Sequence, residues 1–325
     1  MSSDFRAALA GQVLAIDPAK LEGLLARGAS PKSAISQRSA PRSDLGSRGV
    51  MVLPLLGFLD FRPSWLMELF GGTSILQFSQ RFDEAIADPS VNGIVLEVDS
   101  PGGTVAGISE LSGKVFAARA KKPIVAFISP LAASAAFWVA SSAGEVVITP
   151  SGEAGSIGVV LIHEEVSGAN AKAGITFTVL RSTPEKYEAN AVEPLSDSAK
   201  AYLQKQLNTI YGRFVEDVAR NRGVSTATVL ARFGHGRSML ADAAVRAGLA
   251  DRLGSIEGAI TSAGRTPAER RSLANLNRNR RRLAAGLPIP PSIASLRRNM
   301  GFPRTPASQP GHRLQRTHAA RPLRR

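Results

Sequence analysis

The sequence predicts a mixed α/β fold in which helices cover a central sheet. Short apolar runs typical of buried strands alternate, over the middle of the chain, with segments whose apolar residues recur at helical spacing. Turns rich in glycine or serine follow several of the strand-like runs. This alternation is typical of sheets built from strand–helix units, whose functional residues gather where the strands end.

The expected elements follow one another in a regular order. Val50–Leu59 is an apolar run of strand type, and the helix after it has Thr73 or Ser74 as its N-cap. The elements expected next are a strand at 93–99, a helix at 105–120, a strand at 123–128, a small-residue helix at 132–142 and a strand at 145–149. Ile157–Ile162 and Ile175–Leu180 complete the strand set, with a helix between them, and 196–221 has the length and apolar spacing of a long helix.

The composition excludes several kinds of chemistry. The chain has 325 residues, enough for a full hydrophobic core in one or two domains. It contains no cysteine and four histidines, so disulfides, thiol nucleophiles and Cys-ligated metals are excluded, and a multi-His metal site is not expected. Because the sequence also lacks a phosphate loop of P-loop type, we expect neither a metal nor another cofactor.

Three regions of different character are expected: an N-terminal helical segment and linker (1–48), a folded domain (49–263) and a disordered tail (264–325). Apolar residues between Leu9 and Leu25 suit one or two short amphipathic helices. The tail contains 15 arginines, one acidic residue and no lysine, so it carries the whole net charge of +14. Rich in proline and without apolar periodicity, it does not offset its ordering entropy, and its arginines suit contacts with nucleic acid or a capsid.

No part of the sequence predicts a membrane segment. The longest apolar candidate, 49–61, contains Pro54 and is shorter than the ~20 residues that cross a bilayer. The N-terminus lacks the basic-then-apolar order of a secretory signal. We therefore expect a soluble, cytoplasmic protein.

Two of the turns carry candidate groups for acyl chemistry. The turn Asp99–Gly103 ends in paired glycines, whose unshielded N–H groups suit an oxyanion, although a tight strand-to-helix turn explains them equally well. Ser134 opens the small-residue helix, where its hydroxyl is exposed to a substrate and the Ala135 N–H lies beside the reacting carbonyl. An ordinary helix N-terminus is the alternative explanation for this serine.

A serine nucleophile needs a base, and two residues qualify. His163 and Lys186 both follow Ser134 in the sequence. A buried, desolvated lysine can accept a hydroxyl proton, so a Ser/Lys pair is chemically as plausible as a Ser/His pair. The spacing alone does not choose between these bases. A third turn, Gly155–Gly158, contains Ser156 and, taken alone, is better explained as a plain turn.

Taken together, the three turns resemble the signal peptide peptidase A (S49) family of serine proteases, within the Clp/crotonase superfamily. Asp-Ser-Pro-Gly-Gly, then Ala-Ala-Ser134, then Gly-Ser156-Ile-Gly-Val occur in that order, and the resemblance covers about Gly49 to Gly254. It implies a Clp/crotonase-like sheet of repeated β-β-α units with helical cover. A single-repeat chain without a membrane anchor looks most like the phage branch, whose members act as capsid assembly or prohead maturation proteases in the host cytoplasm or the prohead.

The resemblance also implies roles for individual residues. Ser134 matches the nucleophile, Lys186 the general base, and Ser156 the serine that orients the lysine. Because this branch uses lysine, His163 is expected to be structural. The resemblance further implies active sites assembled between neighbouring subunits, and hence a homo-oligomer with 196–221 at its interface.

An oxyanion hole is implied at the two glycine- and alanine-bearing turns. Gly102 or Gly103, together with the Ala135 N–H, matches the family's oxyanion donors. One departure is Ser-Ala-Ala-Phe after the nucleophile, where many members have Ser-Gly-Gly-Tyr. The implied function is a serine endopeptidase that acts on protein or peptide substrates, with capsid and scaffold proteins suspected.

Three alternatives stay open on the sequence. One is a catalytically idle scaffolding or capsid protein with a basic arm, although both Ser134 and Lys186 are present. Another is a Clp-type Ser/His protease that uses His163. The third is a crotonase-type acyl-CoA enzyme, against which the set of Ser134, Ser156 and Lys186 argues, because that chemistry usually relies on carboxylates.

Overall fold

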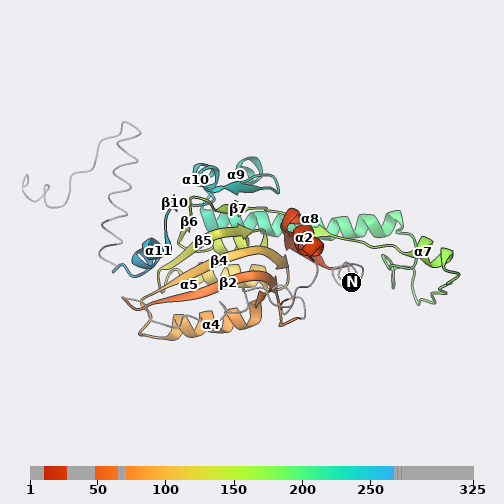
Figure 1. Cartoon of the computed structure of the whole chain (residues 1–325), viewed down its shortest axis with the longest axis horizontal. Helices are drawn as coiled ribbons and strands as arrows, with labels where there is room; N and C mark the ends of the chain where they lie inside the picture. The colour runs from red at the N-terminus through yellow and green to blue at the C-terminus, as the bar shows by residue number, and fades with distance from the viewer. Residues whose placement is uncertain are drawn as a thin grey trace, which may run out of the picture. The chain divides into compact units, whose positions relative to one another are not determined.

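Figure 1 shows the whole chain as a computed structural model, which describes residues 11–27, 48–64, 67, 71–266, 269 and 272. The chain divides into two compact units, Met1–Thr266 and Pro267–Arg325. Only Glu269 and Ser272 of the second unit are described. The expected linker before Gly49 and the expected Arg-rich tail therefore lie almost entirely outside the described residues.

In the described part of the chain, ten strands form one sheet with the central order β10-β6-β5-β4-β1-β8. The strands are β1 (Val13–Ile16), β2 (Val50–Asp60), β3 (Gly72–Ser74), β4 (Gly93–Thr104), β5 (Ile124–Ala133), β6 (Glu145–Ile148), β7 (Glu153–Gly155), β8 (Val160–Leu161), β9 (Ser238–Leu240) and β10 (Arg252–Leu253). The long strands pair in parallel, β2 with β4, β4 with β5 and β5 with β6, while β1, β8 and β9 pair antiparallel. The expected α/β class, with a mostly parallel sheet under helical cover, is confirmed.

Helices cover both faces of this sheet. They are α2 (Pro18–Arg27), α4 (Ile75–Ala87), α5 (Ile108–Ala118), α6 (Ala135–Ala140), α7 (Ser167–Lys172), α8 (Asp197–Arg222), α9 (Thr226–Arg232), α10 (Ala241–Ala247) and α11 (Ile256–Ala263). Along β4, Ile94 and Leu96 pack in the large core with α4, α5, α6 and α8. Val95 points to the opposite face and packs against α11. A strand buried on both faces is apolar at successive positions, which explains the continuous apolar runs in the sequence.

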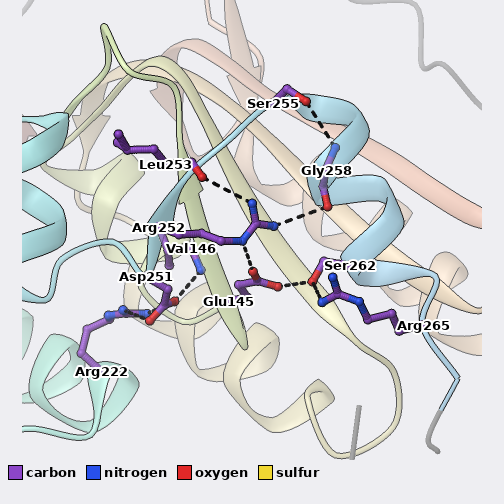
Figure 2. A network of polar contacts seen from close by, with 10 residues as sticks. All are labelled: Glu145, Val146, Arg222, Asp251, Arg252, Leu253, Ser255, Gly258, Ser262 and Arg265. Atoms are coloured by element: carbon purple, nitrogen blue, oxygen red, sulfur yellow. Dashed lines mark hydrogen bonds and ion pairs between the residues drawn. The ribbon is translucent and has the colours of Figure 1, made fainter. Parts of the chain in front are cut away.

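Figure 2 shows how the far edge of the sheet is closed. Arg252 on β10 forms an ion pair with Glu145 on β6 at 2.7 Å, and the other carboxylate oxygen of Glu145 accepts a hydrogen bond from Ser262 on α11. Asp251 accepts a hydrogen bond from the Val146 backbone and forms an ion pair with Arg222 at the end of α8. These contacts tie β10, α11 and the C-terminal end of α8 to the sheet.

At the N-terminus, the helix expected from apolar spacing is only partly correct. Val13–Ile16 is a strand, and the helix α2 begins after it. Asp17 explains the boundary, because its Oδ1 accepts hydrogen bonds from the Ala19 and Lys20 N–H groups at 3.1 and 3.2 Å. An N-cap aspartate followed by proline at the first helical position starts a helix at that point.

The expected strand at Ile175–Leu180 is wrong, and the strand expected at Ile157–Ile162 shortens to β8. Residues 175–180 form no strand, and most of their apolar side chains are exposed, Ile175 by 50% and Leu180 by 93%. They belong to a segment, residues 162–196, that we call the arm; it carries α7 and extends beyond the sheet (Figure 1). A β-prone run becomes a strand only where a neighbouring strand is available to pair with it.

The long helix expected at 196–221 is confirmed as α8, with Ser196 as its N-cap. Its two halves differ. The C-terminal half is buried, with the Phe214 ring stacked on Trp138 of α6 at a centroid distance of 4.1 Å. The N-terminal half is largely exposed and leads into the arm (Figure 1).

Candidate active site

Ser134 lies in a strained turn between β5 and α6. Its backbone has φ 53° and ψ −118°, a combination that L-residues rarely adopt. The turn is held on both sides, because the Ser134 N–H donates to the Gly155 carbonyl at 2.8 Å and its carbonyl accepts from the Trp138 N–H at 2.9 Å. Backbone strain of this kind persists only where the surroundings impose it, and such strand-to-helix turns carry nucleophiles in unrelated hydrolases.

The turn that contains Ser156 packs directly beside Ser134. Ala133 pairs with Gly155 in the sheet, and the Ser134 hydroxyl donates to the Gly158 carbonyl at 3.1 Å. Ser156 itself has a φ of 53°, and its N–H donates to the Arg237 carbonyl at 3.1 Å. The structure therefore brings together two of the three predicted side chains.

The glycine turn lies on the other side of the site, where backbones approach too closely for a side chain. A Cβ added at Gly102 would lie 2.2 Å from the Ala15 carbonyl oxygen and 3.1 Å from that of Ala133. One added at Gly103 would lie 1.9 Å from the Leu59 carbonyl oxygen. The paired glycines are thus required by packing, and they bring this turn next to the strand that ends at Ser134.

The predicted oxyanion donors differ in their present partners. Ala135 is the first residue of α6, so its N–H has no acceptor within the helix. The Gly102 N–H donates to the Ser100 hydroxyl at 3.1 Å, and that hydroxyl donates in turn to the Gly57 carbonyl at 2.6 Å. Stabilisation of an oxyanion by Gly102 therefore requires that its N–H exchange one acceptor for another.

Neither predicted base is hydrogen-bonded to Ser134 in the single chain. Lys186 is exposed on the arm, and among the described residues its side chain forms no hydrogen bond or ion pair. The His163 ring, also on the arm, lies 3.2 Å from the Asn190 carbonyl oxygen through Nε2. The fold of one chain thus assembles Ser134 with Ser156 and leaves Lys186 in solvent.

A groove of about 470 Å³ opens beside the two serines. It is lined by the β8 strand and the residues before it, by the exposed half of α8 including Leu207 and Tyr211, and by Gly236. Gly158 and Gly236, whose carbonyls face the Ser134 and Ser156 hydroxyls at 3.1 and 3.5 Å, both line it. The groove therefore shares with the two serines the backbone that accepts their hydroxyl hydrogen bonds.

Two buried polar residues of α8, which were not identified from the sequence, hold the helix that follows Ser134 in position. Asp217 accepts hydrogen bonds from Trp138 Nε1 at 2.9 Å and from Ser109 at 2.7 Å. The Asn221 amide donates to Ser112 and Ser141. Both fix α6, whose N-cap is Ser134. Their sequence signal was an acid and an amide four residues apart on the apolar face of a helix, where polar groups are buried only with partners.

The model of peptidase family S49 matches residues 117–268 of the chain. The head-tail preconnector protein GP5 of Enterobacteria phage P21 is 32% identical over 217 residues, which cover 66% of this chain and 42% of that protein. The capsid assembly protease C of Escherichia phage lambda is 32% identical over 213 residues, covering 66% and 48%. The resemblance found in the sequence is confirmed, because residues 117–268 match the S49 model and the chain is similar to these two phage proteins.

The chain spans about half the length of these two curated relatives. Among solved structures, the 1510-N membrane-bound stomatin-specific protease matches with a TM-score of 0.38 and 13% identity, over 66% of this chain and 83% of that one.

Two features are absent from the described residues. None of the helices in the ranges that the structure describes is both long and apolar enough to cross a bilayer. The same residues contain no group of three or more His, Cys, Asp or Glu side chains placed to hold a metal ion.

Proposed function

We propose that the chain is a serine endopeptidase in which Ser134 is the nucleophile, Lys186 the general base and Ser156 the residue that orients the lysine. The observation that carries the proposal is the Ser134 turn: a buried serine held in a strained conformation at the start of α6, with the Ala135 N–H free of a helical acceptor. The S49 family match supports it.

The proposed reaction uses only groups of the protein and water. Neutral Lys186 takes the Ser134 proton as the hydroxyl oxygen bonds to the peptide carbonyl carbon, and the Ala135 N–H and the glycine turn stabilise the oxyanion. The lysine ammonium then gives its proton to the leaving amine as the peptide bond breaks. Water then gives a proton to the same lysine as its oxygen bonds to the ester carbonyl carbon, and the lysine returns that proton to the Ser134 oxygen as the ester bond breaks.

A homo-oligomer supplies the lysine in this proposal. All residues of the arm, 162–196, are described, and none is buried in the single chain. Apolar side chains flank Lys186 along the arm and are half exposed or more, including Ile175, Phe177, Leu180 and Tyr187. Exposed apolar clusters mark interaction surfaces, and closed symmetric rings would let each arm reach a neighbour's groove.

Capsid or scaffold proteins are the proposed substrates. The names of the two phage relatives, a capsid assembly protease and a head-tail preconnector protein, support this class. Extended segments with a small residue beside Ser134 suit the site best, because the turns next to Ser134 consist of alanine and glycine. The Arg-rich tail would then contact capsid protein or packaged nucleic acid, and the protein would act in the host cytoplasm or the prohead.

Mixing two inactive variants tests the proposal and the origin of the lysine together. Ser134→Ala and Lys186→Ala are each expected to abolish cleavage of an unfolded protein substrate while keeping the fold and the oligomer mass. Co-refolded in equal amounts, they should recover about a quarter of wild-type activity, because a quarter of the sites pair an intact serine with a neighbour's intact lysine.

His163→Ala is the matched control and should keep activity. Loss of activity in His163→Ala with retention in Lys186→Ala would replace the Ser/Lys pair by a Ser/His pair. Failure of the mixture to recover any activity would show that the lysine acts within its own chain. Absence of cleavage by a folded, oligomeric wild type under all conditions would favour the scaffolding alternative.

A further inference from the structure

The N-terminal strand β1 fills a slot between two other strands. It pairs antiparallel with β4, where Leu14, Ala15 and Ile16 face Thr104, Gly103 and Gly102. It also pairs antiparallel with β8, where Val13 and Leu14 face Leu161 and Val160. Four residues from the N-terminal segment thus complete the sheet over the glycine turn.

This slot begins where β5 ends. Because β2 pairs along one edge of β4 as far as Gly103, β5 and β1 must share the opposite edge. β5 occupies that edge up to the pair of Ser100 with Ala132, and its chain then turns away at Ser134. β1 takes over the same edge from Gly102 onward and runs toward the end of β5, so it lies in line with the proposed nucleophile.

The last residues of β1 are tied to the turns around Ser134. The Asp17 N–H donates to the Pro101 carbonyl at 2.9 Å, next to the glycine pair. The Asp17 carboxylate accepts a hydrogen bond from Ser238 at 2.9 Å, and Ser238 pairs with Gly155. Gly155 is the residue whose carbonyl accepts the Ser134 N–H. The end of β1 is thus linked through Asp17, Ser238 and Gly155 to the Ser134 turn.

We propose that the slot between β4 and β8 is the peptide-binding site, and that Val13–Ile16 fills it as an intramolecular mimic of a substrate. Substrates bind there only when β1 leaves. This inference rests on the proposed peptidase function. Strand addition is a common way for a protein to bind an extended peptide, since main-chain hydrogen bonds give affinity and alternate side chains give specificity. β1 makes those contacts from within the chain, where its effective concentration is high.

The side chains of β1 define the peptide that the groove accepts. Leu14 and Ile16 are buried on one face with Leu21 and Phe58. Ala15 is buried on the other face, within the main core, and its carbonyl lies against Gly102. The slot between β4 and β8 therefore suits an extended peptide with large apolar residues at alternate positions and an alanine-sized residue between them.

Peptide binding without catalysis tests the inference independently of the proposed function. In chains that carry Ser134→Ala, a fluorescent peptide with the sequence of residues 12–17 would be titrated and followed by anisotropy. Leu14→Asp places a charge at a fully buried position of β1 and should release the strand. It is expected to tighten peptide binding by about tenfold or more, because the tethered competitor is removed.

Ala19→Asp is the matched control, since it adds the same charge at an exposed position of the same segment. It should leave peptide affinity unchanged. Equal affinity of the wild-type, Leu14→Asp and Ala19→Asp chains, all with unchanged circular dichroism, would overturn the inference.

If Leu14→Asp does not fold, a reversible disulfide that holds β1 in the slot tests the same inference. The chain has no cysteine of its own, so Val13→Cys combined with Leu161→Cys, a directly facing pair of β1 and β8, allows a single disulfide. The oxidised chain should lose peptide binding, and reduction should restore it. Each single cysteine variant should bind peptide equally under both conditions, and equal binding by the oxidised and reduced double variant would overturn the inference.

The same experiments separate the two proposals. Peptide binding that rises on release of β1 without any hydrolysis by chains that retain Ser134 would leave the inference standing and remove the peptidase function. Hydrolysis at the same rate in the oxidised and reduced double-cysteine chains that retain Ser134 would leave the peptidase function standing and remove the inference.

Discussion

The Ser134 turn and the arm are opposite in character within one chain. Ser134 is fully buried, and its conformation is fixed by hydrogen bonds to Gly155 and Trp138. The arm that carries Lys186 has no buried residue along its described length, 162–196, and presents apolar side chains to solvent. One half of the proposed catalytic pair is therefore built by the fold of a single chain, while the other half lies on a segment that this fold does not pack.

Removal of the nucleophile should give the largest effect on activity. Ser134→Ala is expected to lower kcat/KM by about 10⁴-fold or more, with little change in the unfolding temperature, because the hydroxyl contributes one hydrogen bond to the fold. Ser151→Ala, on an exposed turn nearby, is the control and should retain activity. A Ser134→Ala chain with measurable turnover of a peptide substrate would contradict the assignment.

A phenylalanine-to-alanine substitution should lower the free energy of unfolding strongly in the folded body and very little in the arm. Phe82→Ala removes a fully buried ring from α4 and should cost about 3–5 kcal/mol in the free energy of unfolding. Phe177→Ala removes a ring that is 56% exposed on the arm and should change that free energy by less than about 0.5 kcal/mol.

Phe177→Ala should instead lower the oligomer mass measured by light scattering, and activity with it. Chemical unfolding of the monomeric and oligomeric fractions separates the two effects. A large loss of monomer stability on truncation of Phe177 would erase the contrast between the regions.

Within the folded body, alanine substitutions at two glycines should change the free energy of unfolding in opposite directions. Gly103→Ala places a Cβ against the Leu59 backbone and should destabilise the protein by about 1–3 kcal/mol, because neither strand has room to shift. Gly113→Ala, inside α5 with open space around its Cβ position, should stabilise it by up to about 1 kcal/mol through helix propensity. Thermal unfolding of both variants provides the comparison, and opposite signs are the expected result.

The smallest expected effect is the acid response of the arm. Hydrogen bonds from Arg181 and Asn190 lower the pKa of Glu193, so its charged form is favoured when the arm is ordered. This contribution is fully present above the ordinary glutamate pKa and is lost as the pH falls through the lowered pKa of Glu193. Protection factors for amide exchange, corrected for the intrinsic slowing of exchange in acid, should therefore fall in residues 181–193 as the pH is lowered. Glu193→Gln should remove that pH dependence, while protection in the sheet is unaffected.

The sequence predicted well whatever depends on local pattern. The strand at Val50, the turn at Ser134 and the helix capped by Ser196 were all placed correctly, because apolar periodicity and capping residues act over a few residues. The strand expected at Ile175–Leu180 failed, because pairing requires a neighbouring strand and the local sequence does not show whether one is available.

Long-range contacts explain the remaining differences. Val13–Ile16 is a strand because β4 and β8 leave a slot for it, which no nearby residue reveals. The contact between the turns of Ser134 and Ser156 follows from the pairing of β5 with β7. The role of Asp217 depends on Trp138 and Ser109, which are distant in sequence and meet it only in the folded chain.

The continuity of α8 has a geometric consequence for any assembly that the arm joins. At 1.5 Å per residue, its 26 residues measure about 39 Å, and one end is locked in the body while the other carries the arm. In the proposed oligomer, the length of α8 would therefore set how far from its own sheet each chain reaches toward its neighbour. Deletion of two of its exposed turns would shorten that reach by about 11 Å and should change the mass of the proposed oligomer.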